Sequence, residues 1–469
     1  MEPIELADRL GRWSAGRGPL YLLLAGRLRM LIDDGELPPG ALLPPDRALA
    51  KTLAVGRSTV VAAYDLLSVE GRVVRRQGSG TRVAGLDAPP VRDTTHSPAF
   101  LHLLEPDADV IALACAAPVT PPPEVVQAYG AILPDLAALD GDIGYRPTGH
   151  PLLRNAIAER YRARGVPTDP EQIIVTGGGQ QALSLLARAL LRPGDRVLVE
   201  APTYPGALEA FREVAAVPQA GPIGLGPIGH AALAYVVPTY QNPTGAVLSA
   251  LSRRALTESA RGSGVPLIDD EVLADLGFPG TEPPPLPLAA YDESVISVGS
   301  LSKILWGGMR VGWVRAPIPI IARLSRLRAV HDLGGNIPAQ LAAARLLPEL
   351  DHLCDRITKE RKESHDTLVS ELTTRIPDWN VPPVPGGQTL WIRLPHGDGT
   401  SFAQRALRHG VAILPGTGLD PSGTSTTHIR ISFVATPTTL REAAHRLATA
   451  WRTYEPPAHP VANSPSLAV

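Results

Sequence analysis

The chain has 469 residues, of which 44% are apolar and 19% are charged, and its formal net charge is −2. This length exceeds what one compact core supports, so at least two domains are expected, and the composition excludes a mainly disordered chain. The scarcity of cysteine, at Cys115 and Cys354 only, and the lack of a signal-peptide-like or membrane-spanning apolar run favour a globular, cytoplasmic protein without disulfides or a metal site.

Charge is distributed unevenly along the chain. Residues 1–85 hold 12 arginines or lysines against 9 acidic residues, a charge of +3, which leaves −5 for the remainder. A basic module before an acidic body is compatible with nucleic-acid binding, although a solvated surface explains so small a charge about as well. Any chemistry that needs a lysine amine has four candidates: Lys51, Lys303, Lys359 and Lys362.

The N-terminal part predicts three helices followed by a hairpin. Apolar residues recur at helical spacing over 19–34, and two further helices are predicted over 46–53 and 57–69, joined by a short turn that contains Gly56. Two helices joined in this way are typical of a helix-turn-helix. The segment 73–83 then predicts a β-hairpin of the kind called a wing.

In a helix-turn-helix the start of the second helix meets base edges, and neighbouring groups hold phosphates. The residues expected at DNA are Arg47, Arg57, Ser58, Thr59, Arg75, Arg76 and Arg82. The first four lie on or beside the reading helix, whereas the last three lie on the wing and would contact phosphates. An alternative is that this module serves only for dimerisation.

Residues 19–83 resemble the winged-helix domain of the GntR superfamily, through motifs such as D-G-x-L-P-P-G, R-S-T-V-x-x-A-Y and R-x-G-S-G-T-x-V. The resemblance implies operator contacts from Arg47, Arg57, Ser58, Ser79 and Gly80. The family usually has serine before the first helix of the motif where this sequence has Pro45. The cap of that helix is therefore expected from another residue, such as Asp46.

The rest of the chain changes character twice. Residues 84–108 are rich in proline without a sustained period and are interpreted as a linker. From about Ile111, short apolar runs alternate with helical segments, which predicts a mostly parallel sheet covered by helices. A smaller C-terminal α+β lobe follows. The expected division is 1–83, 84–108, 109–454 and a tail, 455–469.

One segment combines two requirements of pyridoxal phosphate chemistry, a lysine for the Schiff base and cationic and hydroxyl groups for the phosphate. It is S-L-S-K-I-L-W-G-G-M-R-V-G, from Ser300 to Gly312. Lys303 would form the Schiff base, and Arg310 with Ser300 and Ser302 would hold the phosphate, the arginine also lowering the pKa of the lysine.

Other motifs supply the remaining groups. The free N–H groups at a helix start would bind phosphate; they belong to Gly178, Gly179 and Gln180. Asn242 would donate to the 3′ oxygen of the cofactor, and an aspartate of the 269–270 pair, at the carboxyl edge of the sheet, would face the pyridine nitrogen, with its own pKa lowered by that charge pair. Tyr204 would stack on the ring. Taken singly, the glycines could be only a tight turn and the tyrosine a core aromatic.

This order of motifs resembles the fold-type I aminotransferases over about residues 110–450 and, behind the winged helix, the MocR subfamily of GntR regulators. The resemblance implies an α/β fold, pyridoxal 5′-phosphate as cofactor and a homodimer. It selects Asp270 rather than Asp269 as the pyridine partner and directs Tyr145 to the phosphate of the partner subunit. It also assigns Arg430 to a ligand carboxylate; an outward-facing strand arginine is the alternative.

Two features depart from the family. Leu273 stands where many catalytic aminotransferases have a tyrosine, and the segment 211–235 is shorter than usual.

The function indicated by the whole sequence is a DNA-binding transcription regulator that senses pyridoxal phosphate or a small amino compound. The alternatives are an active aminotransferase with an accessory DNA-binding domain, and an enzyme whose N-terminal module only dimerises.

Overall fold

The computed structural model divides the chain into two compact units, Met1–Ser97 and Pro98–Val469. The expected linker, 84–108, and the tail from 457 onward lie outside the described residues. The described residues are 3–11, 13–14, 19–33, 36–38, 40–69, 72–76, 80–83 and 109–456. None of the helices in these ranges is long and apolar enough to cross a membrane.

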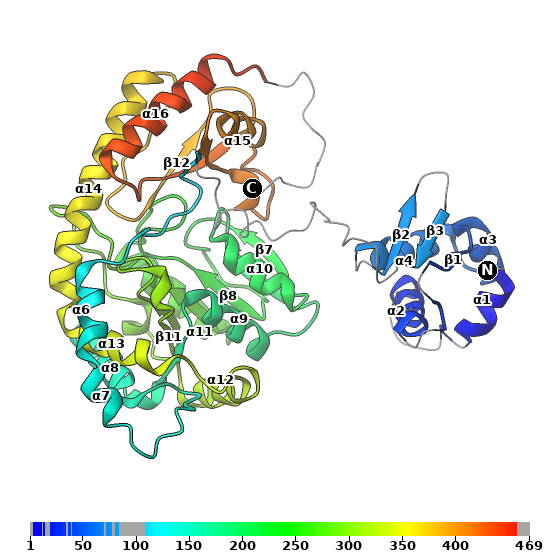
Figure 1. Cartoon of the computed structure of the whole chain (residues 1–469), viewed down its shortest axis with the longest axis horizontal. Coiled ribbons are helices and arrows are strands. Elements are labelled where there is room, and N and C mark those ends of the chain that lie inside the picture. Colours follow the sequence, from blue (N-terminus) through cyan, green and yellow to red (C-terminus); the bar gives the residue numbers. More distant parts are fainter. Residues whose placement is uncertain are drawn as a thin grey trace. The chain divides into compact units, whose positions relative to one another are not determined.

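The described residues of the N-terminal unit form four helices and a small sheet (Figure 1). The helices are α1 (Pro3–Leu10), α2 (Leu20–Asp33), α3 (Asp46–Thr52) and α4 (Arg57–Val69). The strands are β1 (Leu42–Leu43), β2 (Val73–Arg76) and β3 (Gly80–Val83), and they form an antiparallel sheet in the order β1-β3-β2. The helix-turn-helix and the wing are therefore present as predicted.

The core of this unit follows the predicted apolar faces. Leu24, Leu28 and Leu31 of α2 and Tyr64 of α4 are fully buried, and the Tyr64 hydroxyl donates to the carbonyl of Pro44 at 2.9 Å. The helix α1 was not predicted. It packs on α2 and α3, and Arg27 of α2 donates to the carbonyls at its C-terminal end.

The turn between α3 and α4 contains a residue in the left-handed conformation. Ala54 has a φ of 54°, which costs roughly 1–2 kcal/mol for a residue with a Cβ. The prediction that Asp46 caps α3 is wrong. Pro45 is the N-cap without a side-chain hydrogen bond, and Asp46 is the first helical residue.

The larger unit is built on a seven-stranded sheet in the order β5-β11-β10-β9-β8-β6-β7. Its strands are β5 (Ile173–Thr176), β6 (Arg196–Glu200), β7 (Val217–Gly221), β8 (Leu233–Val236), β9 (Leu267–Asp270), β10 (Ile296–Ser300) and β11 (Gly312–Arg315). Only β11 runs antiparallel to its neighbours. The others are parallel, as predicted.

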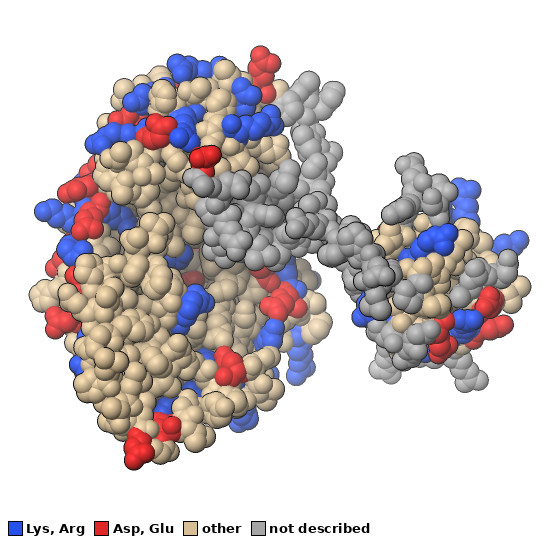
Figure 2. Space-filling view, in the orientation of Figure 1, with Lys and Arg blue, Asp and Glu red and all other residues tan. Residues whose placement is uncertain are grey.

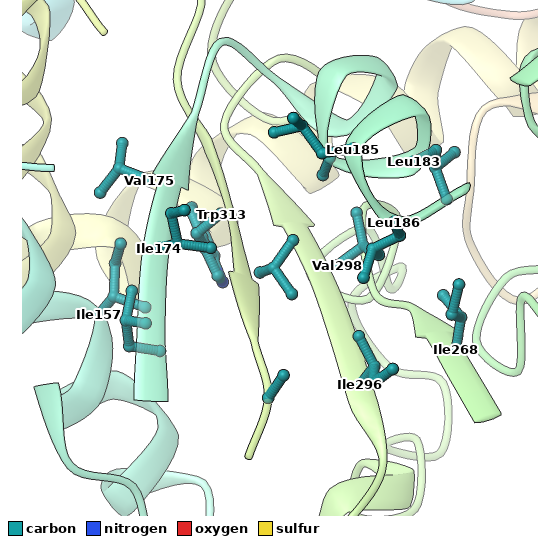
Figure 3. Packing of buried hydrophobic residues seen from close by; sticks show 14 of the residues in the cluster. Ile157, Ile174, Val175, Leu183, Leu185, Leu186, Ile268, Ile296, Val298 and Trp313 are labelled. Atoms are coloured by element: carbon teal, nitrogen blue, oxygen red, sulfur yellow. The ribbon is translucent and has the colours of Figure 1, made fainter. Parts of the chain in front are cut away.

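Two groups of helices pack around this sheet. One contains α9 (Gly179–Leu190), α10 (Pro205–Glu213) and α12 (Ile318–His331); the other contains α6 (Pro123–Ala131), α8 (Pro151–Ala163) and α13 (Ile337–Leu346). The remaining helices of this region are α7 (Leu133–Ala137) and α11 (Ala250–Ser263). Figure 3 shows Leu186 of α9 beside Val298 of β10. Both belong to the apolar layer between the helices and the sheet, and this layer holds the central strands in place.

The C-terminal lobe forms a second core. It contains α14 (Leu350–Arg375), β12 (Thr389–Arg393), α15 (Gly399–Arg408), β14 (Leu414–Pro415), β15 (His428–Ser432) and α16 (Pro437–Arg452), and its sheet has the order β12-β15-β14. The strand β13 (Val411–Ala412) pairs instead with β4 (Ile111–Ala112), so the start of the larger unit returns to this lobe. Figure 1 shows α14 and α16 side by side along it.

The short segment noted in the sequence connects β7 to β8 through residues 222–232 without a helix. Leu225 and Ile228 are buried there, and the N–H of Gly224 donates to Oε1 of Glu200 at 2.9 Å. The shortened connection is thus packed against the sheet and tied to the end of β6.

Candidate functional site

A cavity of about 440 Å³ lies at the carboxyl ends of the central strands, where ligands bind in α/β sheets. Sequence-predicted residues from six separate segments line it. They are Gly179, Gln180, Tyr204, Asn242, Asp270, Ser300, Ser302, Lys303, Arg310 and Arg430. The fold therefore brings these segments together, although they are spread over more than half of the chain.

Lys303 lies in this cavity, and its Nζ donates to the carbonyl oxygen of Ala116 at 2.9 Å. Burial lowers the pKa of the Lys303 amine, and the charges of Arg430 and Arg361 lower it further. Arg310, predicted from the sequence to have this effect, is not among these causes. An amine with a lowered pKa is more often neutral and is a better nucleophile toward a carbonyl.

Asp270 ends β9 and points into the cavity. Its Oδ2 accepts a hydrogen bond from the hydroxyl of Tyr235 at 2.7 Å, and its Oδ1 accepts one from the N–H of Val272 at 3.1 Å. Burial raises the pKa of Asp270 to about 6 in the absence of a bound ring, so the lowering that the sequence predicts from a pyridinium stays a prediction. A pyridinium facing it would lower the pKa again. Asp269 is fully buried outside the cavity and accepts from the N–H of Leu288.

Positive groups converge at the start of α9. Gly178, with φ of 109°, is the N-cap of this helix, and Arg310 lies against it, because a Cβ on Gly178 would be 3.2 Å from Nη2 of Arg310. A Cβ on Gly312 would be 2.7 Å from the backbone carbonyl carbon of Gly178. The Arg-x-Gly spacing thus lets two backbone segments approach closely. A helix N-terminus beside a guanidinium fits a phosphate.

Two hydroxyl groups lie at the same end of the cavity. The Ser300 hydroxyl can donate either to Oγ of Ser302 at 3.0 Å or to the carbonyl of Val311 at 3.2 Å, while the N–H of Ser302 donates to Oγ of Ser300. Hydroxyls with rotatable protons can redirect these bonds toward phosphate oxygens. The residues present therefore fit the phosphate of the cofactor implied by the sequence.

The ring of Tyr204 is held by the side chain of Gln180, for which the sequence predicted only a phosphate contact from the backbone N–H. Its hydroxyl donates to Oε1 of Gln180 at 3.0 Å, and Nε2 of Gln180 donates to the carbonyl of Gly206 at 2.8 Å. A Cβ at Gly206 would overlap both the Gln180 amide oxygen and the Tyr204 ring. Burial raises the pKa of Tyr204, so this hydroxyl stays protonated.

Arg430 points into the cavity and is only 5% exposed, which excludes the alternative of an outward-facing arginine. It donates to Oδ1 of Asn242 at 3.2 Å and to the carbonyl of Ala114. Its Nε is buried without a partner among the described residues. A buried guanidinium whose partners are neutral suits a ligand carboxylate.

Two further positions noted in the sequence can be placed, and some lining residues were missed. Tyr145 is 62% exposed and does not line the cavity of its own subunit, so its contact with the partner's phosphate stays a prediction. Leu273 lines the cavity, at the position where many catalytic aminotransferases have a tyrosine. The lining residues that no motif indicated include Cys115, Val237, Gln388, Thr389, Leu414 and Leu419. They come from loops and strand ends whose sequence carries no recognisable spacing.

The N-terminal unit exposes the start of its second motif helix. Arg57 forms an ion pair with Asp46 at 3.4 Å, Arg47 and Ser58 are exposed, and Thr59 is partly exposed. Gly80 is exposed, with φ of 81°. On the wing, Arg82 donates to the carbonyl of Gly40. The side chains of Arg75 and Arg76, and Ser79, lie outside the described residues.

Figure 2 shows basic and acidic side chains interspersed on the visible face of the larger unit.

Comparisons with known families agree with this division. Residues 20–83 match the bacterial regulatory proteins of the gntR family, and residues 109–222 and 232–447 match the class I and II aminotransferases. The interruption in the second match falls in the short connection between β7 and β8.

Individual proteins share both parts or the larger one. The HTH-type transcriptional regulator YisV of Bacillus subtilis is 29% identical over 90% of this chain and 94% of its own. The HTH-type pyridoxine biosynthesis transcriptional regulator PdxR of Corynebacterium glutamicum is 30% identical over 78% of this chain and 81% of its own. The α-aminoadipate aminotransferase LysN of Thermus thermophilus, solved with a phosphopyridoxyl-leucine, is 25% identical with a TM-score of 0.69, covering 76% of this chain and 95% of LysN.

The winged helix, the aminotransferase fold and the residues of the cavity lead to the same assignment. Pyridoxal 5′-phosphate is the cofactor of this aminotransferase fold, and the GntR-type domain is a DNA-binding domain. The chain belongs to the MocR-type GntR transcription regulators, in which a DNA-binding winged helix is fused to a class I and II aminotransferase domain.

Proposed function

We propose that this chain is a cytoplasmic, homodimeric regulator that binds operator DNA through its N-terminal domain and senses pyridoxal phosphate or a small amino compound in the cavity of the larger domain. The domain limits within this proposal are 1–83 and 109–454, with a linker over 84–108 and a tail over 455–469. The observation that carries it is the position of Lys303 in one cavity with Asp270 and Arg310.

Each group of the cavity has a distinct task in this proposal. Lys303 holds the cofactor covalently, since burial favours its neutral amine. Arg310, the two serines and the start of α9, with Gly178, Gly179 and Gln180, bind the phosphate, and Tyr145 of the partner subunit reaches the same group. When bound, pyridoxal phosphate supplies an electron sink for amino compounds.

The remaining groups orient the ring and the effector. Asp270 holds a proton on the pyridine nitrogen, Tyr204 lies against the ring, and Asn242 donates its amide to the ring oxygen, because Arg430 already occupies the amide oxygen. Arg430 binds the carboxylate of an amino ligand. Leu273 offers no hydroxyl to that ring oxygen, which favours sensing over rapid turnover.

Exposed apolar side chains support a homodimer. Val119, Leu133, Ile143 and Tyr145 lie within one short stretch of the chain and are all more than half exposed. Isolated exposed apolar residues are ordinary, but large ones concentrated in one region are typical of an interface. Two winged helices on one dimer would bind two half-sites together, so the arrangement of the larger domains would affect operator affinity.

DNA binding is assigned to the exposed start of α4. Arg57 and Ser58, with Thr59 beside them, would meet base edges, and Arg47 lies nearby. Arg75, Arg76, Ser79 and Gly80 of the wing would contact the DNA backbone. The pairing of Arg57 with Asp46 supports this role, because a partly ordered arginine loses less freedom when it contacts a base.

A second candidate function is catalysis. The cavity holds a lysine, an aspartate and two arginines in the arrangement that transamination needs, and LysN is an aminotransferase. Turnover of an amino donor with a keto acid at rates typical of enzymes would favour this candidate. The absence of salt-dependent DNA binding would favour an enzyme whose N-terminal module only dimerises.

Operator titration tests the proposal. Footprinting of the DNA upstream of the gene identifies the operator, which is then titrated with wild type and Lys303→Ala, each with and without pyridoxal phosphate. An effector acts only through different affinities for two arrangements of the protein. We expect the cofactor to shift wild-type operator affinity by about 5- to 150-fold and to have a smaller effect on the variant. Equal affinities in all four cases would reject the regulatory role.

A further inference from the structure

A second cavity, of about 430 Å³, lies in the C-terminal lobe, away from the cofactor groups. Its lining includes Asp378, Trp391, Arg393 and His428. None of them belongs to the motifs that indicated the cofactor site. Its chemistry is therefore independent of pyridoxal phosphate.

The two cavities share one face of the sheet β12-β15-β14. In the register of β12 and β15, Trp391 is opposite Arg430 and Arg393 is opposite His428. Directly opposite residues project to the same side of a sheet, and alternate residues of one strand do so too. Arg430 lines the cofactor cavity, so Trp391 stands between the two cavities and Arg393 with His428 belongs to the second.

Flat rings form one wall of the second cavity. The rings of Trp391 and His428 stack with their centroids 5.0 Å apart and their planes 12° apart. Gly416 sits against both, because a Cβ there would be 2.9 Å from Cη2 of Trp391 and 3.0 Å from Cβ of His428. The wall is thus held in place without a ligand, and a flat π-face favours stacking with a planar ring.

Two polar groups of the cavity lack partners. Arg393 is exposed and its side chain makes no ion pair or hydrogen bond with any described residue, whereas Arg375 and Arg446 of the same lobe are paired with glutamates. The Nδ1 atom of His428 is buried and has no hydrogen-bond partner within the described part of the chain. That nitrogen is closed off from the cavity, so the exposed and unpaired guanidinium of Arg393 is the group that suits a carboxylate.

We propose that this cavity is a binding site for a small aromatic carboxylate, with the ring against Trp391 and His428 and the carboxylate on Arg393. Asp378 on the lining disfavours a second negative charge, so the site selects a monoanion over a dianion. The proposal does not depend on whether the protein acts as a regulator or as an enzyme.

The position of Trp391 connects this site with the cofactor cavity. Trp391 packs against the apolar cluster of Ala114, Leu414 and Leu419, and all three of these residues line the cofactor cavity. A ligand that presses on one side of the indole therefore contacts the wall of the other site through a single side chain.

Calorimetric titration of the full-length protein, loaded with pyridoxal phosphate, tests the site with benzoate as probe. Benzamide lacks the charge and cyclohexanecarboxylate lacks the flat ring, so both should bind at least about tenfold more weakly, since each lacks one of the two interactions. Arg393→Gln should weaken benzoate to a similar extent. Arg393 is exposed, so its replacement does not endanger the fold.

Two further variants make the result decisive. Arg408→Gln removes an exposed arginine outside the cavity and should leave benzoate affinity unchanged. Arg430→Gln should also leave it unchanged if benzoate occupies the second cavity. Loss of binding in Arg430→Gln with retention in Arg393→Gln would place benzoate in the cofactor cavity and overturn the proposal. No saturable binding of benzoate to wild type would overturn it as well.

Discussion

The hydroxyl of Tyr235 donates a 2.7 Å hydrogen bond to Oδ2 of Asp270 at the base of the cofactor cavity. With the N–H of Val272 on the other oxygen, each oxygen of the carboxylate has one donor. Both bonds favour the charged form of Asp270 and oppose the effect of burial, which raises its pKa to about 6. The ionisation of Asp270 near neutral pH therefore depends on a residue from the neighbouring strand β8.

Replacement of Tyr235 by phenylalanine should weaken cofactor binding at pH 7. The bond lowers the pKa of Asp270, so its loss raises that pKa and leaves less carboxylate to face a pyridinium. A hydrogen bond to a charged group contributes about 1.5–3 kcal/mol, so we expect roughly tenfold or greater loss of affinity.

The pH dependence of cofactor binding should also change. In wild type, cofactor affinity should fall as the pH decreases through about 6, and in Tyr235→Phe this fall should begin at higher pH. Tyr129→Phe, which removes a hydroxyl of α6 that bonds to no described residue, is the control and should behave as wild type; an identical pH profile in wild type and Tyr235→Phe would contradict the role.

Lys303→Ala should abolish covalent attachment of the cofactor. Purified wild type should be yellow, and borohydride should fix the cofactor to the protein, as seen by a mass increase on the peptide that contains Lys303. Lys359 is exposed on α14, so Lys359→Ala should behave as wild type. A variant without Lys303 that keeps both the absorbance and the borohydride-stable mass would disprove the assignment.

Much of the fold follows from local patterns. The helices α2 and α4 were predictable because burial of one face imposes a helical period on the sequence. Five strands of the large sheet were predictable because burial of both faces leaves short apolar runs, whereas no such run indicated β7 or β11. The Arg310-x-Gly312 spacing was recognisable for a physical reason, since Gly312 must approach the backbone of Gly178. Residues constrained by the backbone in this way leave a motif in the sequence.

Other contacts could not be predicted, because they depend on which strands become neighbours. Tyr235 lies in an apolar run, and its hydroxyl meets Asp270 only because β8 pairs with β9. The same holds for Trp391 and Arg430, which are opposite each other through the register of β12 and β15. Such pairs are separated by many residues and share no fixed spacing. The side-chain role of Gln180 was missed for the same reason, because its partner Tyr204 follows the next strand.

Arg57→Ala should reduce sequence preference more than overall DNA affinity. Arg57 lies at the first turn of α4, where a bidentate contact to guanine contributes about 1–3 kcal/mol of discrimination. Substitution of Arg75 or Arg76 should instead weaken operator and random DNA alike and reduce the salt dependence of binding. Fluorescence anisotropy titrations over a range of salt concentrations measure both quantities. If Arg57→Ala leaves the ratio of operator to random-DNA affinity unchanged, α4 is not the reading helix.

Gly206→Ala should loosen the cofactor cavity, because the added methyl group would overlap the amide oxygen of Gln180 and the ring of Tyr204. One of the two side chains must move, and overpacking of this kind typically costs about 1–3 kcal/mol. We expect a lower melting temperature and weaker binding of pyridoxal phosphate, because the ring of Tyr204 would no longer be held by Gln180.

Gly262→Ala is the matched control for Gly206→Ala. Gly262 lies within α11, and a Cβ there meets nothing within 4 Å. That change should stabilise the protein slightly, since alanine favours a helix over glycine by up to about 1 kcal/mol. Unaltered cofactor affinity in Gly206→Ala would show that the Gln180 bridge does not position Tyr204.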